Sequence, residues 1–280
     1  MEGYAVTGVE LPRNSVRTGD YNTNFIEAGK GEPLILIHGG GAGADARGNW
    51  KGSLPLFAES GFRVIAYDMV GFGDSDAPDP ANFTYDQDAR ITQLIAFLDA
   101  LGLERANIVG NSMGGATALG VAMRRPERLK KLVLMGSAGL SHQTTGALSA
   151  ILNYDFTVPG MQRVIEALTH SDYSPPPEFV AYRHALSVRP NVQAAYKAIM
   201  GTIKAAGGLF YPEEDVARVK VETLVVNGKD DKVVPMSEGY RFLELLENST
   251  GCFLPRCGHW AMIEHPQLFA EITSFFLKRS

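Results

Sequence analysis

The chain has 280 residues, of which 45% are hydrophobic and 20% charged, which excludes disorder and suffices for one large domain or one domain with an insertion. A formal net charge of -5, with Lys and Arg only in short clusters, argues against nucleic acid as a partner. The apolar runs are too short to span a bilayer, and residues 1–11 have no basic segment followed by an apolar core, so we expect a cytoplasmic protein without a membrane partner.

Apolar runs alternate with helical periodicity along most of the chain. Thr23–Glu27 leads through a glycine turn into Pro33–His38, and a continuous apolar run of this kind suits a strand buried on both faces. Similar runs follow at Phe62–Tyr67, Ala106–Val109, Leu129–Met135, Thr223–Val226 and Gly251–Leu254. Helical spacing of apolar residues appears at 94–101 and 269–276. The alternation predicts an α/β fold with a mostly parallel sheet and helices on both faces.

A glycine loop, His38-Gly39-Gly40-Gly41-Ala42-Gly43, follows the first strongly apolar strand. Glycines let a backbone N–H approach a developing oxyanion, and we expect Gly40 to supply one such donor. Gly39 and Gly41 are expected to border the substrate. No Gly-Lys-Ser/Thr follows the loop, and residues 71–75 lack the third glycine of a dinucleotide fingerprint, so nucleotide binding is disfavoured and no cofactor is expected.

A glycine-flanked serine stands between a predicted strand and a predicted helix. The segment Gly110-Asn111-Ser112-Met113-Gly114-Gly115 follows the run at 106–109 and precedes a helical stretch at 116–124. Small residues on both sides allow a sharp turn that exposes the serine hydroxyl. We therefore predict Ser112 as a nucleophile and the N–H of Met113 as the second oxyanion donor.

The strand–helix alternation stops between about residues 139 and 208. This part has no buried-strand run, carries five prolines and is otherwise helical in pattern. We predict a core of residues 1–138 and 209–280 with an inserted helical cap at 139–208 over the carboxyl edge of the sheet, where ligands bind. The alternative is a second helical domain without a role in the chemistry.

An aspartate and a histidine downstream of Ser112 complete a possible set of catalytic residues. In the loop after residue 227, a Gly-x-x-Asp pattern followed by Val-Pro favours Asp231 over its neighbour Asp230. Of the six histidines, His259 is the best general base, because it lies in a loop after the last strand and before an apolar helix. The chain order Ser, Asp, His is that of α/β-hydrolases.

Metal and disulfide chemistry are both disfavoured. His259 and His265 are six residues apart, and no His-Glu-x-x-His occurs, so no metal site is expected. Cys252 and Cys257, the only cysteines, would lie roughly 16 Å apart along an extended strand, too far for a disulfide bond.

Several motifs together resemble the meta-cleavage product hydrolases of aromatic degradation, over about residues 23–277. They are His38–Gly41, Asp68–Gly73, Gly110–Gly115 and Cys257–Trp260. The match is most similar to the carbazole-pathway branch at Ile37–Ala44, Met135–Leu140, Asn153–Thr157 and Gly258–Pro266. The resemblance implies an α/β-hydrolase fold and hydrolysis of a carbon–carbon bond in 2-hydroxy-6-oxo-hexa-2,4-dienoates.

The resemblance also implies a pocket for the substrate acid, formed by Asn49, Asn111, Arg183 and Trp260. A guanidinium with amide groups can hold a carboxylate beside an enol oxygen. The alternative for Arg183 is an ordinary solvated or salt-bridged residue of the cap. For an aryl or aminophenyl tail, apolar candidates are Phe156, Met161, Ile199, Met200 and Leu209, and core packing explains each equally well.

The implied mechanism assigns proton transfer to His259, oriented by Asp231, and attack on the remote ketone to Ser112, with an acyl-enzyme and an activated water both compatible with the sequence. Two other functions remain open: a general carboxylesterase, and a ligand receptor that keeps the hydrolase scaffold. Related enzymes are often dimers or larger, so a homo-oligomer is compatible with the resemblance.

Overall fold

The computed structural model describes residues 11–141 and 146–279. Within these ranges the strands form an eight-stranded sheet in the order β1-β2-β4-β3-β5-β6-β9-β10. Their bounds are β1 Arg13–Thr18, β2 Tyr21–Ala28, β3 Glu32–Ile37, β4 Phe62–Tyr67, β5 Ala106–Asn111, β6 Leu129–Met135, β9 Thr223–Gly228 and β10 Ser249–Leu254. β1 and β2 are antiparallel to their neighbours, and the other pairs are parallel. The mostly parallel sheet predicted from the apolar runs is confirmed.

The central strands explain why the sheet lies inside the molecule. In β3 the four residues from Leu34 to Ile37 have no exposed surface, and β5 is buried along its whole length. β1 alternates exposed and partly buried residues instead, as suits an edge strand, and its polar sequence gave no buried-strand pattern. For this reason β1 was not predicted from the sequence.

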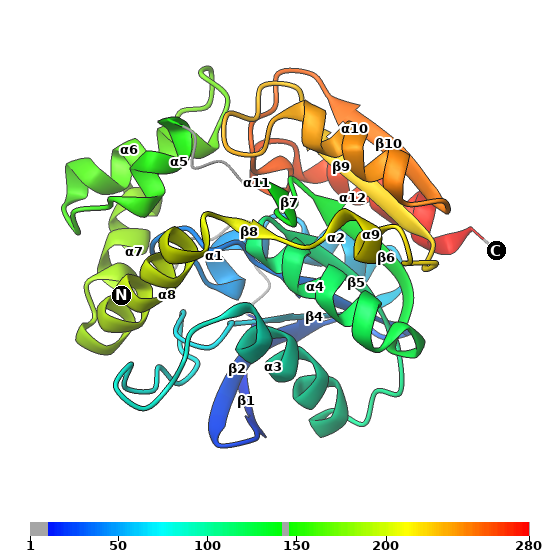
Figure 1. The fold of residues 1–280 in the computed structure, drawn as a ribbon, viewed down its shortest axis with the longest axis horizontal. Helices are drawn as coiled ribbons and strands as arrows, with labels where there is room; N and C mark the ends of the chain where they lie inside the picture. The colour runs from blue at the N-terminus through cyan, green and yellow to red at the C-terminus, as the bar shows by residue number, and fades with distance from the viewer. Residues whose placement is uncertain (1–10, 142–145, 280) are drawn as a thin grey trace.

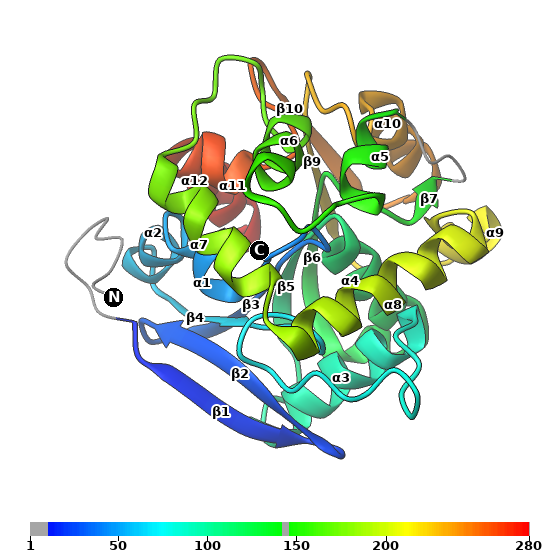
Figure 2. The same cartoon turned by 90° about the vertical axis from the view of Figure 1, so that its left-hand side faces the viewer.

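Helices cover both faces of the sheet (Figures 1 and 2). On one face lie α1 Ala46–Trp50, α2 Leu54–Glu59, α11 Ala261–Glu264 and α12 Pro266–Lys278. On the other lie α3 Gln87–Ala100, α4 Met113–Arg124 and α10 Met236–Leu245. Two short helices, η1 Pro126–Arg128 and α9 Glu213–Val216, complete the core. The α/β-hydrolase fold expected from the sequence is confirmed.

Four helices form a separate layer beside the core, on the left of Figure 1 and facing the viewer in Figure 2: α5 Gly146–Leu152, α6 Val158–Leu168, α7 Pro177–Ser187 and α8 Pro190–Ala206. Two short strands, β7 Leu140–Ser141 and β8 Leu209–Phe210, pair at the base of this layer. Both strands are too short to give a sequence pattern. The helices fall inside the segment 139–208, whose limits as a cap domain stay a prediction.

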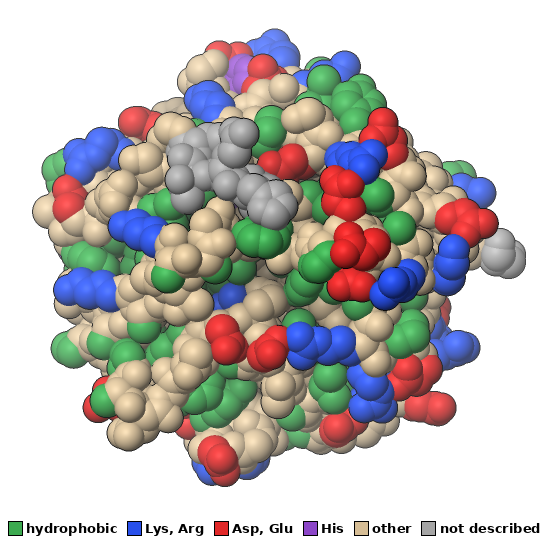
Figure 3. Space-filling view, in the orientation of Figure 1, with side chains coloured by type: hydrophobic (Ala, Val, Ile, Leu, Met, Phe, Trp, Pro, Cys, Tyr) green, Lys and Arg blue, Asp and Glu red, His purple; other side chains and the backbone are tan. Residues whose placement is uncertain are grey.

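The described surface is mixed in charge. On the face of Figure 3, Lys and Arg side chains alternate with Asp and Glu, and no broad basic area appears among the described residues of this face. No helix in ranges 11–141 and 146–279 has both the length and the apolar character needed to cross a membrane.

Candidate active site

Ser112 lies at the turn between β5 and α4 in a strained backbone conformation. Its φ of 54° and ψ of -118° are unusual for a residue with a side chain, and such strain costs about 1–3 kcal/mol. The surrounding glycines are required by space: a Cβ on Gly110 would lie 2.4 Å from the Gly114 carbonyl oxygen, and one on Gly114 would lie 2.5 Å from that of His38. These contacts hold the turn that presents the Ser112 hydroxyl.

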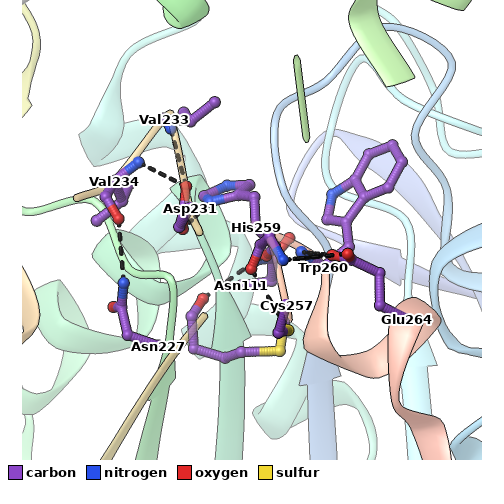
Figure 4. A network of polar contacts seen from close by, with 11 residues as sticks. Asn111, Asn227, Asp231, Val233, Val234, Cys257, His259, Trp260 and Glu264 are labelled. Atoms are coloured by element: carbon purple, nitrogen blue, oxygen red, sulfur yellow. Dashed lines mark hydrogen bonds and ion pairs between the residues drawn. The ribbon is translucent and has the colours of Figure 1, made fainter. Parts of the chain in front are cut away.

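His259 and Asp231 are joined by a buried hydrogen bond of 2.7 Å between Nδ1 and Oδ2 (Figure 4). Asp231 Oδ1 accepts the N–H groups of Val233 and Val234 at 2.8 and 2.9 Å. The carboxylate is therefore an acceptor on both oxygens, so His259 Nδ1 carries the hydrogen and Nε2 has the free electron pair. Asp230, by contrast, has a carboxylate that is about half exposed.

The Nε2 atom of His259 is buried and has no hydrogen-bond partner among the described residues. His259 and Ser112 line the same cavity, hereafter the catalytic cavity. A neutral imidazole with a free Nε2 can accept a proton from a hydroxyl group or from water. The arrangement therefore supports base-assisted attack on a bound substrate.

The glycine loop and the start of α4 lie against each other beside Ser112. A Cβ on Gly40 would lie 3.0 Å from Met113 Sδ, and one on Gly39 would lie 3.2 Å from Ser112 Cβ. Met113 is the first residue of α4, so its N–H has no partner within the helix. Gly39, Gly40, Gly41 and Met113 all line the catalytic cavity, which suits an oxyanion hole of two main-chain donors.

His38 holds the glycine loop from inside. Its Nδ1 donates to the Gly39 carbonyl at 2.8 Å, and its Nε2 accepts the Met69 N–H at 3.0 Å. Because that N–H can only donate, the ring must be neutral for both bonds to form. Complete burial lowers the pKa of His38 to about 4 from the usual 6.5.

This lowered pKa makes stability depend on pH. Between pH 6.5 and about 4 the unfolded chain binds a proton at His38 that the folded chain does not, so the free energy of unfolding falls as the pH falls. We expect the contribution to reach about 3 kcal/mol. Urea unfolding of the wild type and of His38→Gln is compared over this window. The difference between the two proteins separates the contribution of His38 from those of Asp45 and Asp68, whose raised pKa values act in the opposite direction. Equal pH slopes for both proteins would contradict the assignment.

Arg183 reaches from helix α7 into the core. Its side chain is fully buried, with Nη1 donating to Asn49 Oδ1 at 3.2 Å and Nη2 to the Ala42 carbonyl at 2.8 Å. The guanidinium lies 4.8 Å from the ring centre of Trp260. Within the described residues it makes no salt bridge, and its Nε and the Nδ2 of Asn49 have no partner. The alternative prediction for Arg183 was a solvated residue, and the complete burial of its side chain does not fit that prediction.

Burial lowers the pKa of Arg183 to about 10, so the group stays cationic at neutral pH. The Asp45 carboxylate favours the charged form of Arg183 from a distance, but among the described residues it forms no salt bridge with the guanidinium. A buried cation without a directly paired carboxylate is costly. An incoming anion would offset that cost and take up the free Nε hydrogen.

Asn111 differs from the other polar residues of this region because its amide nitrogen is already used. Nδ2 donates to the carbonyls of Met135 and His259 at 3.1 and 3.3 Å, whereas Oδ1 is buried without a partner among the described residues. The group available to a ligand is thus an acceptor. Asn111 and Trp260 line the catalytic cavity, whereas Asn49 and Arg183 are not among its lining residues.

The rest of the catalytic cavity is apolar. Met200 and Leu209, two of the five tail-pocket candidates from the sequence, line it. Phe156, Met161 and Ile199 do not: Phe156 packs against Tyr154 and Tyr196, and the other two have no exposed surface in the core. Further lining residues were not predicted from the sequence, namely Ala138, Leu148, Ile151, Leu152, Leu168, Ile203, Gly208, Val233 and Val234.

Glu264 fixes the loop that carries His259, and the sequence analysis did not identify it. Its carboxylate accepts the Trp260 N–H at 3.2 Å, between two residues labelled in Figure 4. It also accepts the N–H groups of Gly258 at 3.0 Å and of His170 at 2.7 Å. Two of these donors flank His259, and the third belongs to the segment between α6 and α7. One carboxylate therefore joins the histidine loop to the segment that connects α6 and α7.

The other candidate histidines and the cysteines take no part in this arrangement. His184 and His265 bond main-chain carbonyls, and His142 lies outside the described residues. Cys252 and Cys257 are free thiols. Within the described ranges, no group of three or more His, Cys, Asp or Glu side chains is arranged to hold a metal ion.

The strand–elbow–helix unit, the His–Asp pair and the eight-stranded sheet define a serine hydrolase of the α/β class. A family model described as alpha/beta hydrolase fold matches residues 32–266. The 2-hydroxy-6-oxo-6-(2'-aminophenyl)hexa-2,4-dienoic acid hydrolase of Metapseudomonas resinovorans is 48% identical over 94% of this chain and 90% of its own length. The 2-hydroxy-6-oxo-2,4-heptadienoate hydrolase of Pseudomonas putida is 35% identical over 94% and 95%.

Solved structures give the same result. A serine hydrolase involved in carbazole degradation superposes with a TM-score of 0.88 at 45% identity, covering 96% of this chain and 99% of that one. The 2-hydroxy-6-oxo-6-phenylhexa-2,4-dienoate hydrolase of Rhodococcus superposes with a TM-score of 0.89 at 27% identity, covering 96% and 99%. The chain belongs to the meta-cleavage product hydrolases, and the resemblance inferred from its motifs is confirmed.

Proposed function

We propose that this hydrolase cleaves the carbon–carbon bond next to the ketone of a 2-hydroxy-6-oxo-hexa-2,4-dienoate, releasing 2-hydroxypenta-2,4-dienoate and a carboxylic acid. The observation that carries the proposal is the buried, unpaired Arg183 beside a cavity that holds Ser112 and His259. An ester substrate has no need of such a cation. A dienoate does, because its carboxylate is part of the leaving fragment.

Charge and hydrogen bonding suggest how the substrate is held. The carboxylate would take hydrogens from Arg183 Nε and Asn49 Nδ2, the two free donors of the region. The 2-hydroxyl would donate to Asn111 Oδ1, the free acceptor. Trp260 would pack along the guanidinium and close the pocket.

The reaction then proceeds in two stages. Transfer of the 2-hydroxyl proton to the carbon next to the ketone makes a keto intermediate, with His259 as the proton carrier. Attack on the ketone, by Ser112 or by a water activated at the same position, places negative charge on an oxygen held by the N–H groups of Gly40 and Met113. The carbon–carbon bond breaks, and its electron pair is delocalised to the 2-oxygen of the departing dienolate. Water supplies the hydroxyl of the acid.

The lining of the catalytic cavity favours an apolar tail. Apart from Asn111, Ser112, His259 and Trp260, its side chains are apolar and non-aromatic, including Leu148, Ile151, Met200 and Val233, so burial of a phenyl ring is favourable at about 25 cal/mol per Å². No Asp, Glu, Lys or Arg is among the described residues that line this cavity, so a 2'-aminophenyl tail would contact none of them. We therefore expect phenyl and aminophenyl dienoates to be cleaved at specificity constants within about tenfold of each other.

The competing function is a general carboxylesterase, and Arg183→Ala separates the two. Purified wild type should bleach a yellow aryl dienoate. The variant should lose about a hundredfold in kcat/KM for the dienoate, since a buried charge-assisted bond is lost, and much less for a simple aryl acetate. The test is to assay the wild type and Arg183→Ala in parallel on both substrates. Equal losses on both, or none on the dienoate, would favour the carboxylesterase.

The remaining assignments belong to the same proposal. The helical segment 139–208 acts as a cap over the core segments 1–138 and 209–280, and no cofactor takes part. A cytoplasmic location and a homo-oligomer stay predictions, to be checked by cell fractionation and by light scattering of the purified protein.

A further inference from the structure

A pair of side chains outside the catalytic cavity ties the cap to the core. Tyr182, on α7, donates its hydroxyl hydrogen to Asp45 Oδ2. Asp45 stands directly before α1, and its Oδ1 accepts the Gly48 N–H at 2.7 Å, which caps that helix. One buried carboxylate therefore fixes both the start of α1 and the orientation of α7.

The same two helices carry the two residues that meet in the polar region. Arg183 follows Tyr182 on α7, and Asn49 follows Gly48 on α1. Arg183 Nη1 and Asn49 Oδ1 are 3.2 Å apart. Adjacent residues of a helix move together, so any rotation of α7 against α1 changes where the guanidinium and the amide lie relative to each other.

The contact between these helices is close. A Cβ on Gly43 would lie 2.0 Å from the Arg183 carbonyl oxygen, and one on Gly48 would lie 3.0 Å from the Tyr182 ring. Helix α7 thus packs directly on the backbone of the glycine loop and of α1. At this distance a small shift of α7 alters hydrogen-bond geometry around Arg183, and catalysis is sensitive to shifts of about 1 Å.

We propose that Tyr182 and Asp45 are positioning residues that set Arg183 and Asn49 in register to receive the carboxylate of the substrate. Neither residue lines the catalytic cavity. Tyr182 therefore acts through the two helices, and Asp45 acts through them and through its charge on Arg183. The inference rests on the proposed function, because a substrate without that carboxylate does not use Arg183. It makes the tie between cap and core a determinant of specificity rather than of general hydrolysis.

Tyr182→Phe tests the proposal because it removes one hydroxyl and keeps the ring. The matched control is Tyr154→Phe, which removes a buried hydroxyl bonded to Ser187 at 2.9 Å within the cap alone. We expect Tyr182→Phe to raise KM for an aryl dienoate about tenfold while kcat changes less than about threefold. Hydrolysis of an aryl acetate should stay within about twofold, and the control should change neither activity.

A double-mutant cycle shows whether Tyr182 acts through Arg183. In an Arg183→Ala background, Tyr182→Phe should have no further effect on the dienoate. An unchanged KM, equal losses on both substrates with a lowered melting temperature, or additive effects in the cycle would each overturn the proposal. If the wild type bleaches no dienoate, the proposed function fails as well, whereas bleaching with an unaltered KM in the variant removes only this inference.

Discussion

Replacement of Ser112 by alanine is expected to lower kcat for an aryl dienoate by about 10⁴-fold or more, with little change in substrate binding. The hydroxyl stands at the turn between β5 and α4, in the same cavity as the free Nε2 of His259. Among the described residues that line this cavity, Ser112 is the only one with a hydroxyl or thiol group. The rate of bleaching gives kcat, and the absorbance of the bound dienoate measures substrate binding.

The control is Ser137→Ala. Ser137 lies close to the elbow, since a Cβ on Gly115 would be 2.2 Å from its Oγ, but its hydroxyl bonds the Ala138 carbonyl and does not line the catalytic cavity. This variant should keep kcat within about threefold. If Ser112→Ala retained wild-type turnover, Ser112 would have no role as nucleophile or as the group that positions water.

Asp231→Asn is expected to lower kcat by about 10⁴-fold while leaving the fold intact. Asp231 Oδ1 accepts two N–H groups, from Val233 and Val234, and an asparagine oxygen would occupy that position. Its amide nitrogen would then face His259 Nδ1 and donate to it, which forces the ring hydrogen onto Nε2. A ring protonated at Nε2 cannot accept the proton of Ser112 or of water.

Asp230→Asn is the matched control, because the neighbouring carboxylate is about half exposed and its Oδ2 lies 3.8 Å from His170 Nε2. It should change kcat less than about twofold. The pH dependence of kcat is measured for the wild type and for both variants. The wild type and Asp230→Asn should have the same pH profile. Equal losses from the two substitutions would contradict the assignment of Asp231.

Local motifs explain why much of the site could be predicted from the sequence. The elbow at Gly110–Gly115 requires glycines wherever a Cβ would meet backbone, so its sequence determines its geometry. The loop at Gly228–Pro235 is similar: Asp231 bonds N–H groups two and three residues ahead, a contact set by short-range spacing. Such contacts involve residues close in sequence and need no knowledge of the whole fold.

Contacts between the layer of helices α5–α8 and the rest of the chain could not be predicted in this way. Tyr182 and Asp45 are 137 residues apart, and Glu264 bonds His170 across 94 residues. Their partners depend on how α6 and α7 dock. The prediction of the tail pocket was only partly right for the same reason. Met200 faces the catalytic cavity, whereas its neighbour Ile199 faces the core, and the rotation of α8 determines which of the two faces the cavity. Edge strand β1 was missed because its alternating polarity resembles that of a loop.

The most direct test of the account is a product balance for an aryl 2-hydroxy-6-oxo-hexa-2,4-dienoate with the purified wild type. Each dienoate that loses its colour should give one aryl carboxylic acid and one 2-hydroxypenta-2,4-dienoate, identified by chromatography and mass spectrometry. Colour loss without the acid, or rapid aryl acetate hydrolysis by folded enzyme that leaves every dienoate intact, would contradict carbon–carbon bond hydrolysis at this site.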